Sequence, residues 1–341
     1  MFSWSSYSKP AIVLSPMSGY TDSAFKQIVR YLAPKAVLFT EFVSSDAVAF
    51  KSPKTLRMMA FDQKEHPVIL QVFGKKVENF VETAKIAEKM GYDGIDINMG
   101  CPAKKIIRSE HGSALVKIEN QQTAFKIVSE MSSAVKIPVS VKTRLGWTSA
   151  DDLVEFCKKL EKYGCASICI HGRTTRQGYG GEANWEPIYE VKRALKIPVF
   201  GNGDIRTVSD FRKKLGNLDG VFIGRAAIGD PLLISDIFKY LSNREEYDQL
   251  SDASLDLHFP RGGDIAWGIK KPIVIKHCRL AAKTKGEQLG VLEMRKHLAV
   301  YIKGLPGVRD VRNKLMKACR PDEVSSIINA IRITNAFESA D

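Results

Sequence analysis

The 341-residue sequence predicts an α/β protein, with a (β/α)8 TIM barrel over residues 1–241 and then a linker and small all-helical domain over residues 242–341. Three observations predict this fold. Eight short runs rich in Val, Ile and Phe follow one another along the chain, helix-like segments separate most of them, and only helical periodicity comes after them. Strands that alternate with helices form a parallel sheet, and eight such units in about 220 residues match a barrel.

The eight predicted strands are residues 11–17, 36–42, 67–74, 94–100, 138–144, 166–172, 198–204 and 220–226. Residues 77–91 and 150–164 are typical of the helices between them. The first of these ends on a glycine, and the second carries carboxylates in its first turn, where the helix dipole favours them. An open doubly wound sheet is the competing fold, but the segment SPMSGYTD (15–22) lacks the G-x-G-x-x-G signature of a dinucleotide-binding half.

The last third of the chain predicts helices. Residues 242–264 are polar and rich in turn-forming residues, so we expect them to form a connection. Two apolar stripes with three- and four-residue steps follow, and each predicts one helix face: Val291, Met294, Leu298, Tyr301 and Leu305, then Val308, Val311, Leu315 and Ala318. Arg295 and Lys296 lie off the first stripe, on the predicted basic exterior.

Positive charge is concentrated in the same region. The net charge of the chain is +13, and residues 270–320 contain 14 basic and three acidic side chains, a net charge of +11. Such a region predicts a polyanionic partner, above all a nucleic acid. A solvated basic surface and a membrane-adhesive patch are the alternatives.

Composition favours the reducing cytoplasm. No apolar run approaches the roughly 18–20 residues of a membrane span. The first ten residues lack the basic and apolar segments of a signal peptide. The six cysteines include no CxxC pair, which argues against a disulfide framework and against a zinc site. We therefore expect a cytoplasmic protein with no metal and no membrane partner.

Five polar residues interrupt the apolar strands near their C-terminal ends: Gln71, Asn98, Lys142, His171 and Asn202. Helices cover the strands of a parallel barrel, which should otherwise be apolar. The active site of a barrel lies at the C-terminal ends of its strands, so these residues predict a site there. A lysine in such a place needs an anion or an electron-rich ring, and amides suit the edge of a heterocycle. His171 could be a base, an anion partner or a structural histidine.

Glycine-rich segments follow the last two predicted strands. GNGDI (201–205) and GRAAIGDP (224–231) would let backbone N–H groups approach an anion, and Arg225 adds a positive charge. Either motif alone is typical of a tight turn. Because phosphate sites in barrels commonly form after strands seven and eight, the two motifs together predict a phosphorylated ligand.

A cysteine, Cys101, lies in the segment NMGCP (98–102) after the fourth predicted strand. A thiol with a pKa of about 8.5 is mostly protonated near pH 7 and can still give up its proton, which suits a general acid. A buried packing residue and a covalent nucleophile are the alternatives, and a nucleophile could use His111 or His171 as its base. The residues alone leave acid and nucleophile open.

Over nearly its whole length the chain resembles the tRNA-dihydrouridine synthases, flavin enzymes of the (β/α)8 class, and most of all their bacterial branches. The combination of GCPAKKI with HGRTTRQGYGG is the most specific part of the resemblance. Ser18 and Lys26 stand where Ala and Arg are common in the family, and the loop IIRSEHGSALV (106–116) replaces a Gly-rich one. The matching motifs are LSPMSGYTDSAF (14–25), VILQVFG (68–74), DINMGCPAKKI (96–106), GSALV (112–116), VSVKTRLGW (139–147), HGRTTRQGYGGEANW (171–185), PVFGNGDI (198–205), GVFIGRAAIGDP (220–231) and MRKHLAVYIKGLPG (294–307).

The resemblance implies FMN as the cofactor, NADPH or NADH as the reductant and tRNA as the substrate. It implies cofactor contacts by Pro16, Met17, Ser18, Gln71, Lys142, His171, Asn202, Gly203, Asp204, Gly224 and Arg225. It implies substrate contacts by Asn98, Arg173 and Thr174 at the target base, and by the basic helical domain, including Arg295 and Lys296. Cys101 matches the proton donor of the family.

The implied reaction reduces the C5–C6 bond of one uridine in tRNA. The uridine would leave the base stack, flavin N5 would pass hydride to C6, and Cys101 would protonate C5 from the opposite side. A dihydroorotate dehydrogenase-like flavin enzyme acting on a free pyrimidine is one alternative, but it leaves the basic C-terminal region unexplained. A tRNA-binding protein with an inactive barrel is the other.

Overall fold

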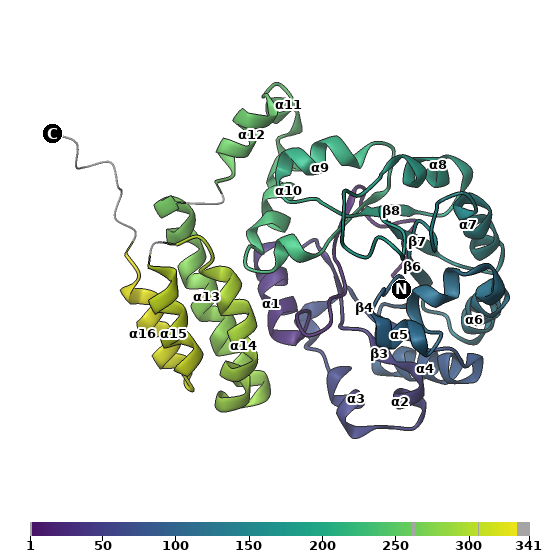
Figure 1. Ribbon diagram of the computed structural model, residues 1–341, viewed down its shortest axis with the longest axis horizontal. Coiled ribbons are helices and arrows are strands. Elements are labelled where there is room, and N and C mark those ends of the chain that lie inside the picture. Colours follow the sequence, from purple (N-terminus) through teal and green to yellow (C-terminus); the bar gives the residue numbers. More distant parts are fainter. Residues whose placement is uncertain (1, 261–262, 306, 333–341) are drawn as a thin grey trace.

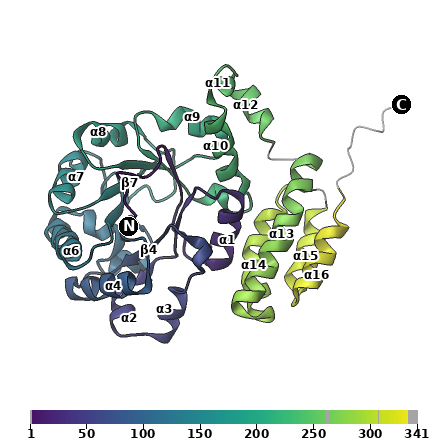
Figure 2. The same ribbon diagram turned by 180° about the vertical axis from the view of Figure 1, so that it is seen from behind.

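A computed structural model describes residues 2–260, 263–305 and 307–332. Eight parallel strands form a barrel surrounded by helices, and a second group of helices lies beside it (Figures 1 and 2). The strands pair in chain order, and the last pairs with the first to close the ring, which confirms the predicted TIM barrel. They are β1 (Ala11–Leu14), β2 (Val37–Phe39), β4 (Val68–Phe73), β5 (Gly94–Met99), β6 (Val139–Arg144), β7 (Ser167–His171), β8 (Val199–Asn202) and β9 (Gly220–Ile223), while the short β3 (Val43–Ser44) pairs with β4 alone.

Helices cover the outside of the barrel, and two predicted ones are confirmed as α4 and α7. The larger helices are α1 (Ser23–Leu32), α4 (Val77–Met90), α6 (Gln121–Ala134), α7 (Leu153–Lys162), α8 (Glu186–Ala194), α9 (Val208–Leu215) and α10 (Leu232–Ser242), and the shorter ones are α2 (Ser45–Ala49), α3 (Pro53–Met58) and α5 (Lys104–Arg108). Among the residues described, no helix combines the length and the apolar character that a membrane crossing needs.

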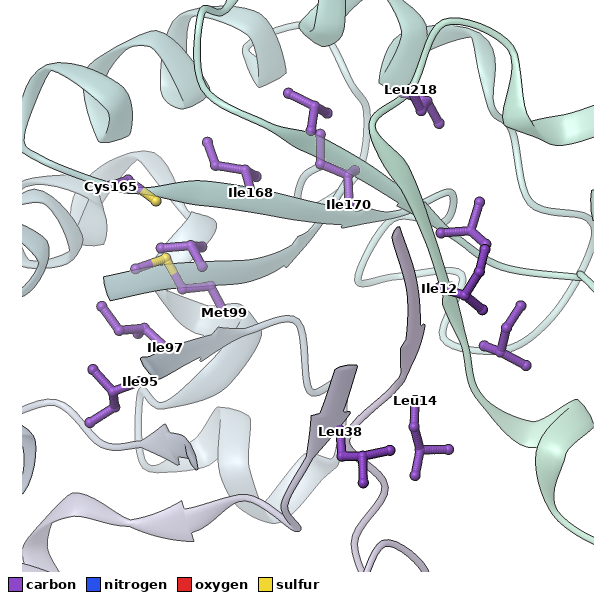
Figure 3. Packing of buried hydrophobic residues seen from close by; sticks show 14 of the residues in the cluster. Ile12, Leu14, Leu38, Ile95, Ile97, Met99, Cys165, Ile168, Ile170 and Leu218 are labelled. Carbon is purple, nitrogen blue, oxygen red and sulfur yellow. The ribbon is translucent and has the colours of Figure 1, made fainter. Parts of the chain in front are cut away.

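The barrel strands are mostly apolar because both of their faces are buried, and polar side chains gather toward their C-terminal ends. Successive side chains of a strand point to opposite faces. In β1, Ile12 and Leu14 belong to the cluster between strands and surrounding helices (Figure 3). Ala11 and Val13 belong to a separate cluster inside the barrel, which Trp4 of the N-terminal segment joins.

The C-terminal helices are α13 (Gly263–Lys285), α14 (Glu287–Tyr301), α15 (Val308–Lys317) and α16 (Pro321–Ala330). Their common core buries Val291, Met294, Leu298 and Tyr301, so the predicted stripe is the buried face of α14. Ala24 of α1 belongs to the same core, and both views show α13 and α14 beside α1 (Figures 1 and 2). The helical group therefore packs on the barrel through α1.

Residues 261 and 262 of the predicted connection (242–264) lie outside the described residues. Its described part contains two short helices, α11 (Arg244–Tyr247) and α12 (Asp252–His258), before α13 begins. Ser251 caps α12 by accepting a hydrogen bond from the backbone N–H of Ser254 at 3.2 Å. Asp252 forms ion pairs with Arg212 and Lys213 of α9. A cap and ion pairs to the barrel thus give helical structure to a segment whose polar composition indicated an irregular one.

Candidate active site

A cavity of about 400 Å³ lies at the C-terminal ends of the barrel strands. Strand register brings its residues together, because Asn98 of β5 is paired with Lys142 of β6, and His171 of β7 with Asn202 of β8. Side chains at matching positions of neighbouring parallel strands point to the same face. Twelve predicted site residues line the cavity: Pro16, Met17, Gln71, Asn98, Cys101, Lys142, His171, Asn202, Gly203, Asp204, Gly224 and Arg225.

A chain of hydrogen bonds fixes the wall that carries Cys101. The buried carboxylate of Asp96 accepts from Gln71 Nε2 at 2.7 Å, and Gln71 Oε1 accepts from Asn98 Nδ2 at 2.9 Å. Asn98 Oδ1 then accepts from the backbone N–H groups of Gly100 at 3.1 Å and Cys101 at 2.9 Å. Because an ionised carboxylate only accepts, Asp96 sets the orientation of the Gln71 amide, which in turn sets that of Asn98.

The Cys101 thiol is partly buried at the edge of this wall. Burial raises its pKa above the ordinary value, although nearby cations oppose the shift. The thiol is therefore protonated at neutral pH. The structure thus presents a neutral S–H group to the cavity.

The two histidines considered as bases are poorly suited to activate Cys101, one because of its pKa and the other because of its position. Burial, together with neighbouring cations, lowers the pKa of His171 to about 2, so its ring is neutral and weakly basic. Nη1 of Arg173 lies 3.4 Å from His171 Nε2, which makes that nitrogen the hydrogen-bond acceptor. His111 does not line the cavity. This geometry favours an acid over a nucleophile at Cys101.

Lys142 brings an amine into the cavity from β6. Its Nζ donates to Asn202 Oδ1 at 2.9 Å, and Asn202 Nδ2 donates to the carbonyl of Phe222 at 2.8 Å. Burial lowers the pKa of Lys142. An ammonium group has three donors, so Lys142 can bind an electron-rich ring or an anion as well as Asn202.

Arg173 and Thr174, which were predicted to contact the substrate, lie behind the cavity and do not line it. Arg173 is buried, and its Nη2 pairs with Asp204 Oδ2 at 2.6 Å. Its guanidinium also donates to the carbonyls of Gly180 and Gly181 at 3.0 and 2.5 Å. A buried guanidinium requires such acceptors, and here they hold two loops together. Direct substrate contact by either residue stays a prediction.

The other predicted residues outside the cavity are Ser18, Arg295 and Lys296. Ser18 is exposed. Nη2 of Arg295 donates to the carbonyl of Ala318 at 3.2 Å and so links α14 to the end of α15. Nζ of Lys296 lies 5.6 Å from the centroid of the Tyr20 ring, at the contact between α14 and the barrel. The cavity therefore does not include them.

Sequence reasoning missed Arg144 and Tyr179, which also line the cavity. Arg144 is buried and donates to three loop carbonyls at 2.7–3.0 Å, so it ties together the loops after β5 and β7. The Tyr179 ring lies within 5.4 Å of the guanidinium of Arg144 and 4.7 Å of that of Arg225. The sequence did contain a signal for Arg144. It follows Lys142 by two positions in the same strand, so its side chain must point to the same face of the strand. The remaining lining residues are Ser15, Phe42, Gly100, Pro102, Ile205, Arg206, Phe222 and Ala226.

The loops after β8 and β9 form the other end of the cavity. Gly203 has a φ of 126°, a conformation that glycine adopts at no steric cost. A Cβ on Gly224 would enter the space beside Ser15, 3.7 Å from its Cβ. Arg206 and Arg225 add exposed guanidinium groups here. In the described part of the chain, no group of three or more His, Cys, Asp or Glu residues could hold a metal ion.

The chain is similar in sequence to known enzymes over most of its length. A sequence model of the family described as Dihydrouridine synthase (Dus) matches residues 13–338. A "Probable tRNA-dihydrouridine synthase 1" of Synechocystis sp. is 36% identical over 310 residues, which cover 90% of this chain and 82% of that protein. A "tRNA-dihydrouridine synthase B" of Pseudomonas aeruginosa is 34% identical over 304 residues, or 88% of this chain and 86% of its relative.

Solved structures with the same fold are more distant. Histamine dehydrogenase from Rhizobium sp. 4-9 matches with a TM-score of 0.52 and 15% identity over 79% of this chain and 48% of that chain. The old yellow enzyme homologue from Zymomonas mobilis matches with a TM-score of 0.51 and 12% identity over 69% of this chain and 88% of that chain. These likenesses show the barrel fold alone. Because the family match extends through the barrel and the C-terminal helices, the chain belongs to the dihydrouridine synthase family.

Proposed function

We propose that this protein is an FMN-dependent tRNA-dihydrouridine synthase that uses NADPH or NADH to reduce the C5–C6 bond of one uridine in tRNA. The observation that carries the proposal is the neutral Cys101 thiol, held in the wall of a cavity that also contains Lys142 and Asn202. Family membership supports a tRNA substrate. It also favours this reaction over a dihydroorotate dehydrogenase-like one and over a tRNA-binding protein without activity.

The residues of the cavity fit FMN. The volume of about 400 Å³ lies within the range of small-molecule sites. Lys142 and Gln71 would donate hydrogen bonds to the flavin ring, and Pro16, Met17 and the exposed Ser18 would lie along it. Asn202, Gly203, Asp204, Gly224 and Arg225 would hold the ribityl and phosphate end, where the missing Cβ of Gly224 leaves room. Bound FMN would supply the hydride for C6 of the uracil.

Cys101 would hold the proton that C5 of the uracil receives. The thiol is neutral at neutral pH, and the hydrogen bond from its backbone N–H to Asn98 keeps it in the wall. Neutral His171 would hydrogen-bond the bound ring without carrying a competing proton. Because the acid must be protonated, activity should persist at neutral pH and fall only as alkaline pH removes the thiol proton.

Replacement of Cys101 tests the proposal. Cys101→Ala should keep its flavin and the reduction of that flavin by NADPH, but should form dihydrouridine on unmodified tRNA about 10²- to 10⁴-fold more slowly. Flavin absorbance and dihydrouridine assays measure the two properties. The exposed Cys319 of the helical group offers a matched control, and Cys319→Ala should behave as the wild type.

Two results would contradict the proposal at different levels. Unchanged turnover of Cys101→Ala would remove Cys101 as the acid and leave the flavin enzyme standing. A colourless protein that cannot be reconstituted with FMN would remove the enzyme as a whole.

The basic helical group would bind tRNA through its phosphates and shape. Arg309, Arg312 and Lys317 of α15 are exposed. Their joint replacement by Ala should weaken tRNA binding and lower the slope of log K against log salt by about one unit for each lost phosphate contact, with flavin content unchanged. Arg295 is kept in this variant because its guanidinium links α14 to α15.

The control for this experiment removes three exposed lysines from α4 and α6, namely Lys85, Lys89 and Lys126. These helices lie across the barrel from the helical group (Figure 1). Equal salt slopes for the two triple variants would show that the helical group is not the tRNA platform.

The domain boundary and the location of the protein belong to the same proposal. We place the boundary between catalytic and tRNA-binding parts near residue 241, where α10 ends at Ser242. We also propose that the protein works in the cytoplasm, because tRNA and the nicotinamide reductant are found there.

A further inference from the structure

A second cavity, of about 250 Å³, lies between the loop after β6 and residues 116–121. Its buried apolar lining comes from Val116, Leu145, Leu153 and Phe156, and the exposed Ile118 lies at its edge. Polar and charged side chains complete the lining, among them Gln121, the cations of Lys117 and Arg144, and the carboxylates of Glu119 and Asp152. An apolar floor with a few polar groups is typical of a small-molecule or base-binding site.

Trp147 gives this second cavity its chemical character. Its side chain is half-buried, Lys117 Nζ lies 4.5 Å from the ring centroid, and the guanidinium carbon of Arg176 lies 5.9 Å from it. Lys117 Nζ also pairs with Glu119 Oε1 at 3.4 Å, and the Glu119 side chain is exposed, so this pair is open to solvent. An aromatic ring flanked by cations binds a planar base by stacking and its phosphate by charge. The expected ligand is therefore a nucleotide.

The cavity is preformed by hydrogen bonds between two loops. The backbone N–H of Arg176 donates to the carbonyl of Trp147 at 3.0 Å, and that of Thr175 donates to the carbonyl of Gly146 at 2.9 Å. These bonds hold the loop after β6 against the loop after β7. A ligand therefore meets an ordered surface and loses little affinity to loop ordering.

Arg144 lines both cavities, so one side chain separates the second cavity from the candidate active site. It is buried and held by three loop carbonyls, which makes it a fixed wall. A uridine that enters the first cavity remains covalently linked to its neighbours in the strand. An adjacent nucleotide therefore stays close to the first cavity, and the second cavity shares the wall at Arg144 with it.

We infer that the second cavity binds the base of a nucleotide next to the target uridine, stacked against Trp147, with a phosphate near Lys117 and Arg176. The inference rests on the proposed function and deepens it, because it names a subsite for the flanking RNA. Contacts to flanking nucleotides set the sequence context of enzymes that act on an extruded base. The adenine of the nicotinamide reductant has similar chemistry, and the experiment separates the two sources.

Steady-state kinetics of the flavin-loaded protein on unmodified tRNA test the inference. Trp147→Ala should raise the KM for tRNA roughly tenfold or more, the usual effect of losing one stacked base. Flavin content, the rate of flavin reduction by NADPH and the KM for NADPH should stay unchanged. Trp147→Phe should recover most of the affinity, which separates stacking from general damage to the fold.

Replacement of single lysines provides a second test of the inference. Lys117→Ala should weaken tRNA binding and lower its salt slope, whereas Lys162→Ala, at the far end of α7, should do neither. Fluorescence gives an independent readout, because Trp4, Trp185 and Trp267 are buried and Trp147 is the half-buried tryptophan. Unmodified tRNA should quench the emission of the wild type but not that of Trp147→Ala, and NADP⁺ should leave the Trp147 emission unaltered.

Three outcomes overturn the inference. An unchanged KM for tRNA in Trp147→Ala would remove the base-binding subsite. A rise in the KM for NADPH, or quenching of Trp147 by NADP⁺, would assign the cavity to the reductant. Quenching that persists in Trp147→Ala would place the RNA elsewhere. A wild-type protein that forms no dihydrouridine would instead overturn the proposed function, so the two failures are distinguishable.

Discussion

At the scale of single residues, the position of Cys101 in the cavity wall depends on Asp96, a side chain that does not itself line the cavity. Asp96 is buried beneath Gln71, and burial raises its pKa to about 6 against the effect of hydrogen bonds from Gln71 and Ser140. It is therefore largely ionised at neutral pH and accepts both hydrogen bonds. The amide orientations that follow from this put Asn98 Oδ1 toward the backbone of the Cys101 loop.

Asn98→Ala tests whether Asn98 positions the Cys101 thiol, because the substitution does not alter the thiol itself. The substitution frees the backbone N–H groups of Gly100 and Cys101, so the thiol should lose its fixed place and kcat on tRNA should fall about 10- to 100-fold. Flavin absorbance should be retained. Asn217, an exposed residue between α9 and β9, provides a matched control.

If Asn98 only stabilised the fold, Asn98→Ala would give a different result. Loss of stability would lower the flavin content and the melting temperature together. The positioning hypothesis is wrong if Asn98→Ala keeps the kcat of the wild type.

At the scale of elements, the helical group depends on close contact between α13 and α14. A Cβ built on Gly290 of α14 would lie 2.5 Å from the carbonyl carbon and oxygen of Ala281 in α13. Backbone atoms at such a site cannot move aside as a flexible side chain would. The glycine therefore sets how closely the two helices approach.

A pair of glycine substitutions tests this contact. Gly290→Ala should lower the free energy of unfolding by about 1–3 kcal/mol, because the added methyl group forces the helices apart. Gly268→Ala in α13 should raise it by about 0.5–1 kcal/mol, because no atom of the described residues beyond the local helix backbone lies within 4 Å of the added Cβ, and alanine favours a helix. Denaturant unfolding measures both, and equal effects of the two would contradict the close-contact explanation.

At the scale of the whole molecule, barrel and helical group meet at buried histidines. His277 of α13 and His297 of α14 pack against Phe25 of α1, with ring centroids 5.4 and 5.2 Å away. Burial lowers the pKa of His277 to about 4 and that of His297 to about 2. Close by, Lys285 forms ion pairs with Asp22, the N-cap of α1, and with Glu293 of α14.

The low pKa values of these two histidines predict that acid weakens the contact between the barrel and the helical group. Both folded pKa values lie below the unfolded value of about 6.5, so the unfolded state binds more protons in acid. Their stabilisation is complete above pH 6.5 and declines by up to about 1.4 kcal/mol per histidine for each pH unit below it, down to the folded pKa.

Unfolding measured between pH 7.5 and 5 checks this dependence. His277→Gln should show a smaller loss of stability over the interval than the wild type, since one of the titrating groups is gone. Identical pH slopes for the two proteins would contradict the assignment.

The sequence by itself determined the eight-stranded barrel and the face that carries the site. Hydrophobic periodicity, helix ends and glycines after strands are local properties, and the closure of a parallel barrel brings all strand ends to one face. That is why Gln71, Lys142 and Asn202 could be assigned to one cavity from their positions in the strands alone. Acid and nucleophile at Cys101 could not be distinguished in this way.

Only the tertiary structure decided what surrounds each of these residues. Arg144 is the last residue of β6 and Arg173 follows β7, yet one lines the cavity and the other is paired behind it with Asp204. The cavity at Trp147 forms between segments that contact one another only in the folded chain. Burial, hydrogen-bond partners and pKa depend on neighbours that are distant along the chain, and no local pattern specifies those neighbours.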